Sequence, residues 1–470
     1  MFSRNPWSGV RVYNKALIKD DPISLFSDIY GAHFLNRTVN QALTFITRRM
    51  ADDGKWAAID QAVISLSNFA ASILLARLVS PTELGVYVTG FLAIYFIRAI
   101  QNGLIIQPLN TIGAVSSMDE FKPYFSAAAI QQLVLASFSS VGALLLGWIL
   151  TQFGNDTLGP AVFTLWFSFF TWQLQEFFRR VFYTRGSVVK TVWISVSANL
   201  IRIGLILILS LYQPISGLTG LNAIGWGSLV ATLLGAWLAR DYFTKKINRL
   251  LVTWLENWRF GRWILGASMA EWVVVDLYPI MMAGLVSFAA AGAYQSLQNL
   301  VAPIHVLLRA MDTFATPIAA KAFHESGLPK LTDILKKIYI FSGIPVFGLL
   351  ILDLIFTPYL LYLLKGDTYL PFANGIYVMA VFYIFLFINR PLQMAFRAIN
   401  KGKQVFIANI LAALSMFTLG FGLISRWGLY GAIGGQALNA FIISLVLFIA
   451  WRKNARHIEK RTGVELNRES

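Results

Sequence analysis

About twelve long apolar stretches, separated by short polar segments, constrain this chain more than any other feature. Each stretch has the roughly 20 apolar residues that an α-helix needs to cross the hydrocarbon core of a bilayer. Charged residues make up only 13% of the 470 residues, whereas a soluble domain carries about 25%. So little charge is insufficient to cover a soluble globular surface. The sequence therefore predicts an all-α polytopic membrane protein.

Positive charge is divided unequally between the two sides of the predicted spans. The spans are expected at 57–78, 86–106, 125–150, 160–178, 191–211, 219–239, 264–285, 293–320, 338–357, 373–396, 404–424 and 429–451. Thirty-two of the 39 Lys and Arg residues fall on the side that holds both termini, and only Lys365 and Arg426 fall in loops on the other side. Cytoplasmic loops carry the excess of Lys and Arg. Both termini are therefore expected in the cytoplasm, with the chain in the inner (plasma) membrane.

Three short motifs occur twice along the chain, in the same order and about 210 residues apart. They are Leu78-Val79-Ser80-x4-Gly85-x-Tyr87 with Leu285-Val286-Ser287-x4-Gly292-x-Tyr294, Leu174-Gln175-x2-Phe178-Arg179 with Leu392-Gln393-x2-Phe396-Arg397, and Gly217-Leu218-Thr219-Gly220 with Gly428-Leu429-Tyr430-Gly431. They predict two pseudo-symmetric six-helix lobes, 56–243 and 264–451. Because each lobe has an even number of spans, both have the same orientation in the membrane. Two such lobes around a central cavity are typical of transporters that work by alternating access.

Three further segments flank these lobes. Residues 1–55 form a cytoplasmic extension, which is either an interfacial helix ending at Arg48-Arg49 or a partly disordered basic segment. Residues 244–263 form an amphipathic linker in which Leu250, Trp254 and Trp258 belong to an apolar stripe, which is typical of a helix lying at the membrane interface. Residues 452–470 form a basic cytoplasmic tail.

Basic residues within the spans predict an anion site, because charges inside a membrane are costly and mark function. The residues expected to bind an anionic head group are Arg98, Arg202, Arg309, Arg390 and His305. The guanidinium group binds phosphate or carboxylate with paired hydrogen bonds. Amides expected to contact substrate hydroxyls are Gln101, Asn102, Gln298 and Asn299. Two alternatives remain open at this stage: Arg309 pairs with Asp312 for structural reasons, and the amides bond neighbouring helices.

Acidic residues within the spans predict where transport is coupled to an ion. Asp276, three residues before Pro279, is the first candidate for binding a proton or sodium ion, and Glu271 is the second. The chain has no Cys and only four scattered His residues, so neither a metal site nor a cofactor is expected. The excess of positive charge reflects cytoplasmic loops, and nucleic acid is not an expected partner.

The segment Ala76-Arg77-Leu78-Val79-Ser80-Pro81-Thr82-Glu83-Leu84-Gly85-Val86-Tyr87 resembles the signature of polysaccharide transporters, the Wzx-type lipid-linked oligosaccharide flippases. These belong to the multidrug/oligosaccharidyl-lipid/polysaccharide exporter superfamily. The resemblance covers roughly 56–450 and implies a flippase that moves undecaprenyl-pyrophosphate-linked oligosaccharide to the outer leaflet for polysaccharide such as exopolysaccharide or O-antigen. It also implies candidate partners in the polysaccharide polymerase and chain-length machinery.

Three other functions were weighed against the flippase. A cation-coupled multidrug antiporter of the same superfamily would favour a carboxylate-rich site, whereas here arginine lies in the middle of the predicted spans. An integral-membrane glycan polymerase or ligase would need a large outer loop with catalytic groups, and the longest predicted outer loop is near Thr357–Phe372. A non-transporting scaffold is disfavoured by the cost of buried charge. We therefore expect a transporter and no enzyme, with the sugar, the coupling ion and the oligomeric state left open.

Overall fold

The computed structural model describes residues 32–244, 250–399 and 401–469 of the chain. Side-chain surroundings are described within residues 55–453, with gaps that include Glu271, Arg309 and Asp312. The chain divides into two compact units, Met1–Ile59 and Asp60–Ser470, and the predicted extension 1–55 falls in the first. The second unit contains both predicted lobes and is described below.

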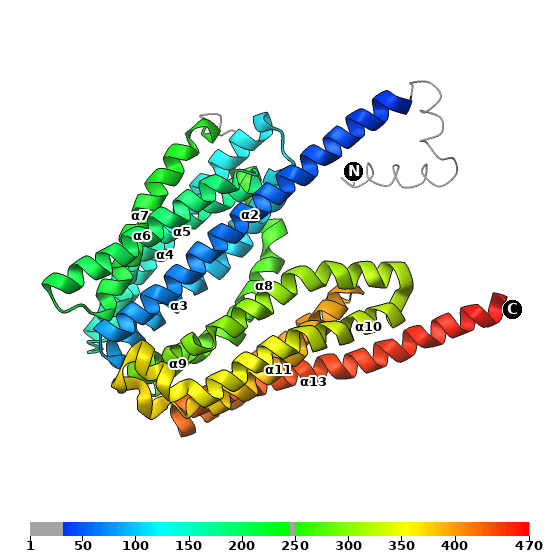
Figure 1. The fold of residues 1–470 in the computed structure, drawn as a ribbon. Helices are drawn as coiled ribbons and strands as arrows, with labels where there is room; N and C mark the ends of the chain where they lie inside the picture. The colour runs from blue at the N-terminus through cyan, green and yellow to red at the C-terminus, as the bar shows by residue number, and fades with distance from the viewer. Residues whose placement is uncertain (1–31, 245–249, 400, 470) are drawn as a thin grey trace, which may run out of the picture. The chain divides into compact units, whose positions relative to one another are not determined.

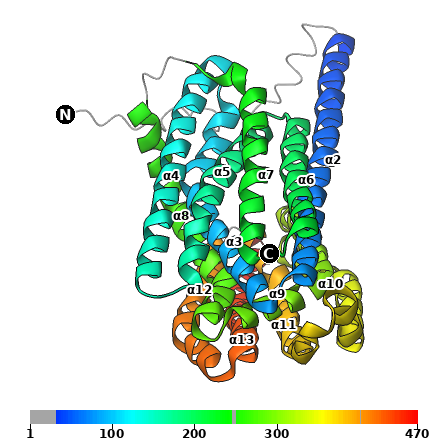
Figure 2. The same ribbon diagram turned by 90° about the vertical axis from the view of Figure 1, so that its left-hand side faces the viewer.

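The first half of the second unit is a bundle of helices joined by short turns. Its elements are α2 (Ala32–Leu78, of which the residues from Asp60 belong here), α3 (Pro81–Gln101), the π-helical turns η1 (Asn102–Ile106) and η2 (Leu109–Gly113), α4 (Met118–Gln152), α5 (Leu158–Thr184), α6 (Val188–Tyr212), α7 (Gly217–Leu238) and the short η3 (Arg240–Tyr242). Figures 1 and 2 show α4, α5, α6 and α7 side by side, with α3 packed against α5 and α7.

The second half repeats this arrangement with longer, kinked helices. Its elements are α8 (Leu250–Leu285), α9 (Phe288–Leu300), α10 (Ala302–Lys365), η4 (Asp367–Phe372), α11 (Gly375–Ala398), α12 (Gly402–Ser415), the π-helical η5 (Met416–Gly420) and α13 (Phe421–Glu469). Two of these helices, α10 and α13, each join parts of two predicted spans. α10 bends at Ser326 and Gly327, and α13 bends at Gly428, where φ is +55° and glycine avoids the steric cost of a Cβ atom.

Several helix boundaries differ from the prediction. The second span begins at Pro81 instead of residue 86, because Ser80 caps the helix by accepting a hydrogen bond from the Glu83 amide at 3.3 Å and proline suits the first turn. The span predicted at 293–320 is interrupted at Val301, just before Pro303, which lacks the amide donor. The linker predicted at 244–263 does not end as a separate helix, since from Leu250 it continues without a break to Leu285.

The described helices are compatible with about twelve membrane crossings. Among the described residues, eight helical segments are each long and apolar enough to cross a bilayer, and one of them, Gly402–Lys453, covers two predicted spans. Large apolar side chains are exposed on the outside of the bundles, for example Phe138, Trp193 and Phe341. An exposed apolar surface of this extent fits contact with lipid. The prediction of an all-α, multi-pass membrane protein is therefore confirmed.

The repeated motifs lie at corresponding points of the two halves. The first motif begins α3 and α9, where Ser80 and Ser287 are both N-cap residues. The second motif lies near the C-terminal ends of α5 and α11. The third motif begins α7 and, in the second half, coincides with the kink of α13 at Gly428. This correspondence, together with the helix order, supports the two pseudo-symmetric lobes.

Candidate functional site

The first repeated motif forms the closest contact between the two halves. Gly85 of α3 lies against the backbone of Phe288, so that a Cβ atom at Gly85 would come within 1.7 Å of the Phe288 carbonyl oxygen. Gly292 of α9 lies against Pro81 in the same way, and a Cβ atom at Gly292 would come within 2.3 Å of the Pro81 carbonyl oxygen. A shift of 207 residues along the chain converts one contact into the other. The motif therefore packs one half against the other around a local two-fold axis, at the helix ends predicted to face outward.

Polar bonds reinforce this contact between the halves. Asn299 of α9 donates a hydrogen bond from Nδ2 to the Ser72 hydroxyl of α2 at 2.7 Å, and both side chains are buried. Arg77, at the end of α2, donates to the carbonyl oxygen of Leu363 in α10. Asn299 was predicted to contact substrate, and in this structure its amide joins the two halves.

Helix α8 also connects the two halves, through its contacts with η1 and α4 of the first half. Gly261 approaches the carbonyl oxygen of Gly103, and Gly103 in turn lies against the backbone of Leu265. Asn102, next to Gly103 in η1, donates a hydrogen bond to the hydroxyl of Ser268 at 3.3 Å. Nearer its start, α8 packs on α4 through the hydrogen bond from the Tyr124 hydroxyl to Asn257, at 2.9 Å. The N-terminal part of α8 is thus held by the first half.

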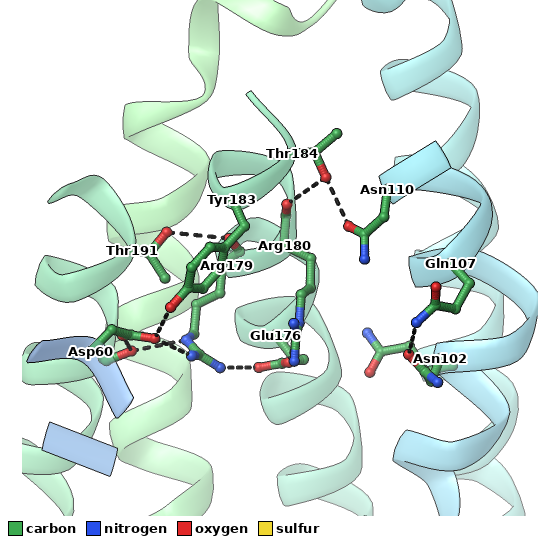
Figure 3. Close-up of polar contacts among 12 residues, drawn as sticks. Asp60, Asn102, Gln107, Asn110, Glu176, Arg179, Arg180, Tyr183, Thr184 and Thr191 are labelled. Atoms are coloured by element: carbon green, nitrogen blue, oxygen red, sulfur yellow. Dashed lines mark hydrogen bonds and ion pairs between the residues drawn. The ribbon is translucent and has the colours of Figure 1, made fainter. Parts of the chain in front are cut away.

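A buried network of four charges lies among α2, α5 and α6 (Figure 3). Arg179 of α5 pairs with Asp60 of α2 at 2.6 Å and with Glu176 one turn earlier in α5. Arg180 pairs with the other oxygen of Glu176 at 2.7 Å. Asp60 also accepts hydrogen bonds from the hydroxyls of Tyr183, at 2.7 Å, and Ser195. Each charge in this network therefore has an opposite charge as partner.

The burial of this network was not expected from the sequence. Asp60 and Glu176 lie near predicted cytoplasmic ends of spans, where carboxylates are usually hydrated, yet their exposed fractions are only 1% and 4%. Arg179 is 8% exposed. The spacing of Glu176, Arg179 and Arg180 at i, i+3 and i+4 is a signal for pairing on one helix face. Nothing in the local sequence indicates that Asp60, 119 residues away from Arg179, completes the network.

Two further arginines of the first half have no carboxylate at ion-pair distance among the described residues. Arg98 of α3 is exposed and lies over the Tyr95 ring, 5.4 Å from its centre. It is close enough to Glu176 for their charges to interact. Arg202 of α6 is 5% exposed, and the Nη1 atom donates to Asn68 Oδ1 at 2.9 Å. Nε and Nη2 of Arg202 have no hydrogen-bond partner.

The predicted hydroxyl contact Gln101 takes part in an amide network inside the first half. Its Nε2 atom donates to Gln132 Oε1 at 2.8 Å and to the carbonyl oxygen of Gln173 at 2.7 Å. The Gln173 side chain in turn donates to Ser139 at 2.6 Å. This arrangement joins α3, α4 and α5. It corresponds to the interhelical bonding that the sequence left open as the alternative for these amides.

The second half has a polar network of its own around Gln298 of α9. Gln298 donates to the Tyr294 hydroxyl at 2.6 Å, and that hydroxyl donates to Gln436 of α13 at 2.7 Å. The Tyr383 hydroxyl of α11 donates to Gln298 Oε1 at 3.2 Å. The ring of His305, at the start of α10, contacts the Tyr383 ring edge-to-face at 5.2 Å. Two predicted site residues, Gln298 and His305, are thus brought together with Tyr383, which the sequence analysis did not single out.

The remaining predicted site residues are only partly described. Asp276 lies half-buried in α8 and is close enough to the Tyr294 hydroxyl for the carboxylate charge to act on it. Arg390 lies half-buried in α11. The side chains of Glu271 and Arg309 fall outside the described residues, so the predicted pair of Arg309 with Asp312 stays a prediction. Within the described part of the chain, no group of three His, Asp or Glu residues is placed to hold a metal ion.

Comparisons with known proteins identify the fold. No protein-family model matches the chain, and no curated protein sequence matches it. Among solved structures, an inward-facing multidrug resistance MATE family transporter of the MOP superfamily matches with a TM-score of 0.70 at 15% identity, over 86% of this chain and 99% of that one. The lipid II flippase MurJ, in an inward closed conformation, matches with a TM-score of 0.58 at 14% identity, over 84% and 87% of the chains.

A third solved structure is a MOP superfamily transporter from Pyrococcus furiosus, described as having a binding pocket of reverse polarity. It matches with a TM-score of 0.56 at 15% identity, over 85% of this chain and 94% of that one. The three structures share the superfamily fold, in multidrug transporters as well as in a lipid flippase. The chain therefore has the fold that these transporters share.

Proposed function

We propose that this protein flips a lipid-linked oligosaccharide, carried on undecaprenyl pyrophosphate, from the cytoplasmic to the outer leaflet of the inner membrane. The observation that carries the proposal is the excess of guanidinium groups around Glu176. Arg98, Arg179 and Arg180 all act on the single carboxylate of Glu176. With Asp60 included, three arginines are present against two carboxylates. A pyrophosphate head group is the kind of ligand that such an excess favours.

A cation-coupled multidrug antiporter is the second candidate, and the fold of the MATE family match supports it. A cationic drug needs a carboxylate that is free to receive it. In the first half both buried carboxylates already have arginine partners, which argues against a cation site there. The lipid II flippase match supports the fold for a lipid-linked substrate equally well. An integral-membrane glycan polymerase or ligase receives no support from transporter neighbours.

Arg98 is the residue we assign to first contact with the head group. It is exposed, lies near the middle of the helical run 81–113, and is held in place by the Tyr95 ring rather than by an ion pair. Arg309, Arg390 and His305 remain the proposed contacts from the second half. Asp276 remains the proposed site for a coupling proton or sodium ion, with Glu271 as the second candidate.

Transport would follow from rocking of the two halves. The contact of Gly85 with Phe288 and of Gly292 with Pro81 closes the end that we predict to face outward. A substrate entering from the predicted cytoplasmic side would then be released outward when this contact opens, as in alternating access. Polysaccharide polymerase and chain-length proteins remain the proposed partners.

The test is translocation in proteoliposomes. The purified protein is reconstituted with a fluorescent undecaprenyl-pyrophosphate oligosaccharide, and arrival at the opposite leaflet is followed by a membrane-impermeant quencher. We expect Arg98→Gln to lower the rate about ten- to hundredfold, the value of one charge-assisted hydrogen bond, with Arg98→Lys intermediate. The matched control is Arg240→Gln, at an exposed arginine beyond the end of α7. Efflux of cationic dyes without lipid translocation would support the antiporter instead.

A further inference from the structure

Among the described residues, Arg202 is the one arginine of the first half that is both buried and without a carboxylate partner. It extends from the middle of α6, where its backbone lies beside Gly227 of α7. Its side chain reaches Asn68 of α2, and the hydroxyl of Tyr87 in α3 is close enough to interact with its charge. Arg202 therefore lies inside one half, at the meeting point of four helices.

The hydrogen-bonding capacity of Arg202 is largely unused. A guanidinium group has five N–H donors, and here only Nη1 has an acceptor, the neutral amide oxygen of Asn68 at 2.9 Å. Nε and Nη2, which carry three of the five donors, meet no acceptor although they are buried. An isolated buried charge without a counter-charge is strongly unfavourable in a low-dielectric interior. The surroundings thus lack one negative charge and several acceptor positions.

The burial of Arg202 limits the size of the anion that can bind it. At 5% exposure, Arg202 is closed off from a pyrophosphate carrying a lipid and an oligosaccharide. One monatomic anion supplies one negative charge and accepts from several donors without directional demands, and the Tyr87 hydroxyl is a further donor in range. We propose that Arg202 binds a halide ion, chloride under physiological conditions, at a site formed with Asn68 and Tyr87.

This site is separate from the proposed transport function. The predicted role of Arg202 in binding the head group passes to the exposed Arg98, and Arg202 instead holds a resident inorganic anion. An anion bound there neutralises the charge of Arg202 and links α2, α3 and α6. The stability of the protein should then depend on halide even when no lipid substrate is present.

The experiment measures thermal unfolding of the full-length protein in detergent by tryptophan fluorescence. Sodium gluconate is replaced by sodium chloride or sodium bromide at constant ionic strength, and no lipid-linked substrate is added. We expect a saturable rise in Tm on the order of a few degrees with either halide, because a ligand that binds the folded state alone stabilises it. Arg98→Gln is the matched control and should keep this rise.

Two variants decide whether Arg202 is responsible. Arg202→Gln should abolish the halide-dependent rise. Asn68→Asp places a carboxylate where the Arg202 partner now lies, so this variant should be independent of halide and should unfold in gluconate at or above the Tm of the wild type in chloride. Asn68→Asp also decides the question if Arg202→Gln fails to fold. A wild type that is indifferent to halide, or a rise that persists in Asn68→Asp, would overturn the proposal. Failure of lipid translocation alone would leave it standing.

Discussion

Removing the charge of Arg179 is the sharpest test of how the first half is held together. Arg179→Met keeps an unbranched but shorter side chain and deletes the guanidinium donors. The structure assigns three bonds to these donors: to Asp60 at 2.6 Å, to Ser195 at 2.9 Å, and to Glu176. The two carboxylates are affected unequally. Glu176 keeps Arg180 at 2.7 Å, whereas Asp60 keeps only the hydroxyls of Tyr183 and Ser195.

The expected cost follows from the burial of Asp60. Its exposed fraction is 1%, so an unpaired carboxylate there has almost no access to water. Breaking a buried ion pair by removing one partner destabilises a protein by about 3–5 kcal/mol. Arg179→Met should therefore lower the free energy of unfolding by about that amount. Adding Asp60→Asn should recover most of the loss, because the stranded charge is removed, while adding Glu176→Gln should recover much less.

The assay is a double-mutant cycle on membrane abundance and on thermal stability in detergent. The matched control is Arg240→Gln, which removes an exposed arginine whose only described carboxylate neighbour, Asp241, is at 3.9 Å and should change stability little. Equal rescue by Glu176→Gln and Asp60→Asn would refute the unequal pairing. An unchanged stability of Arg179→Met would refute the buried network altogether.

Two more predictions concern the contact between the halves. Gly85→Ala should lower the Tm in tryptophan-fluorescence melts because its Cβ atom would lie 1.7 Å from the Phe288 carbonyl oxygen. Gly142→Ala is the control and should leave the Tm unchanged, since a Cβ atom there meets nothing within 4 Å. A similar loss of Tm in both variants would argue against this contact. Because the chain has no Cys, Ser72→Cys with Asn299→Cys creates a single pair where a 2.7 Å hydrogen bond now joins the halves. Oxidation should slow transport in the proteoliposome assay, and reduction should restore it. Transport at full rate in the cross-linked protein would contradict the proposal that this contact between the halves opens during transport.

Much of the fold could be predicted from the sequence because it depends on local properties. Span length and hydropathy are set within about 20 residues, and they gave the helices that the structure contains. The repeated Leu-Val-Ser-x4-Gly motif located the starts of α3 and α9, including both serine caps. The resemblance indicated the superfamily whose fold the solved structures share. The merging of predicted spans into α10 and α13 was missed, since a kinked turn and a loop have similar local composition.

The polar side chains could be located on their helices but not paired. Arg98 and Arg202 have the same local pattern in the sequence, since neither has an acidic residue one turn away. In the structure, however, Arg98 is exposed and Arg202 is buried, with an exposed fraction of 5%. Gln101 and Asn299 were predicted to contact substrate hydroxyls, with bonding between helices as the alternative, and each bonds another helix. In the same way, nothing in the sequence indicated that Asp60, near the start of the first span, forms an ion pair with Arg179, at the end of the fourth.

The sequence by itself therefore determined that this is a two-lobed membrane protein with arginines inside its spans. Only the tertiary structure decided which of those charges are neutralised, by bringing Asp60 to Arg179 across 119 residues and leaving Arg202 with a neutral amide. The physical reason is the separation along the chain over which each effect acts. Hydrophobic periodicity acts between residues three and four apart on one helix, whereas an ion pair or a hydrogen bond requires atoms about 3 Å apart on helices that packing alone brings together.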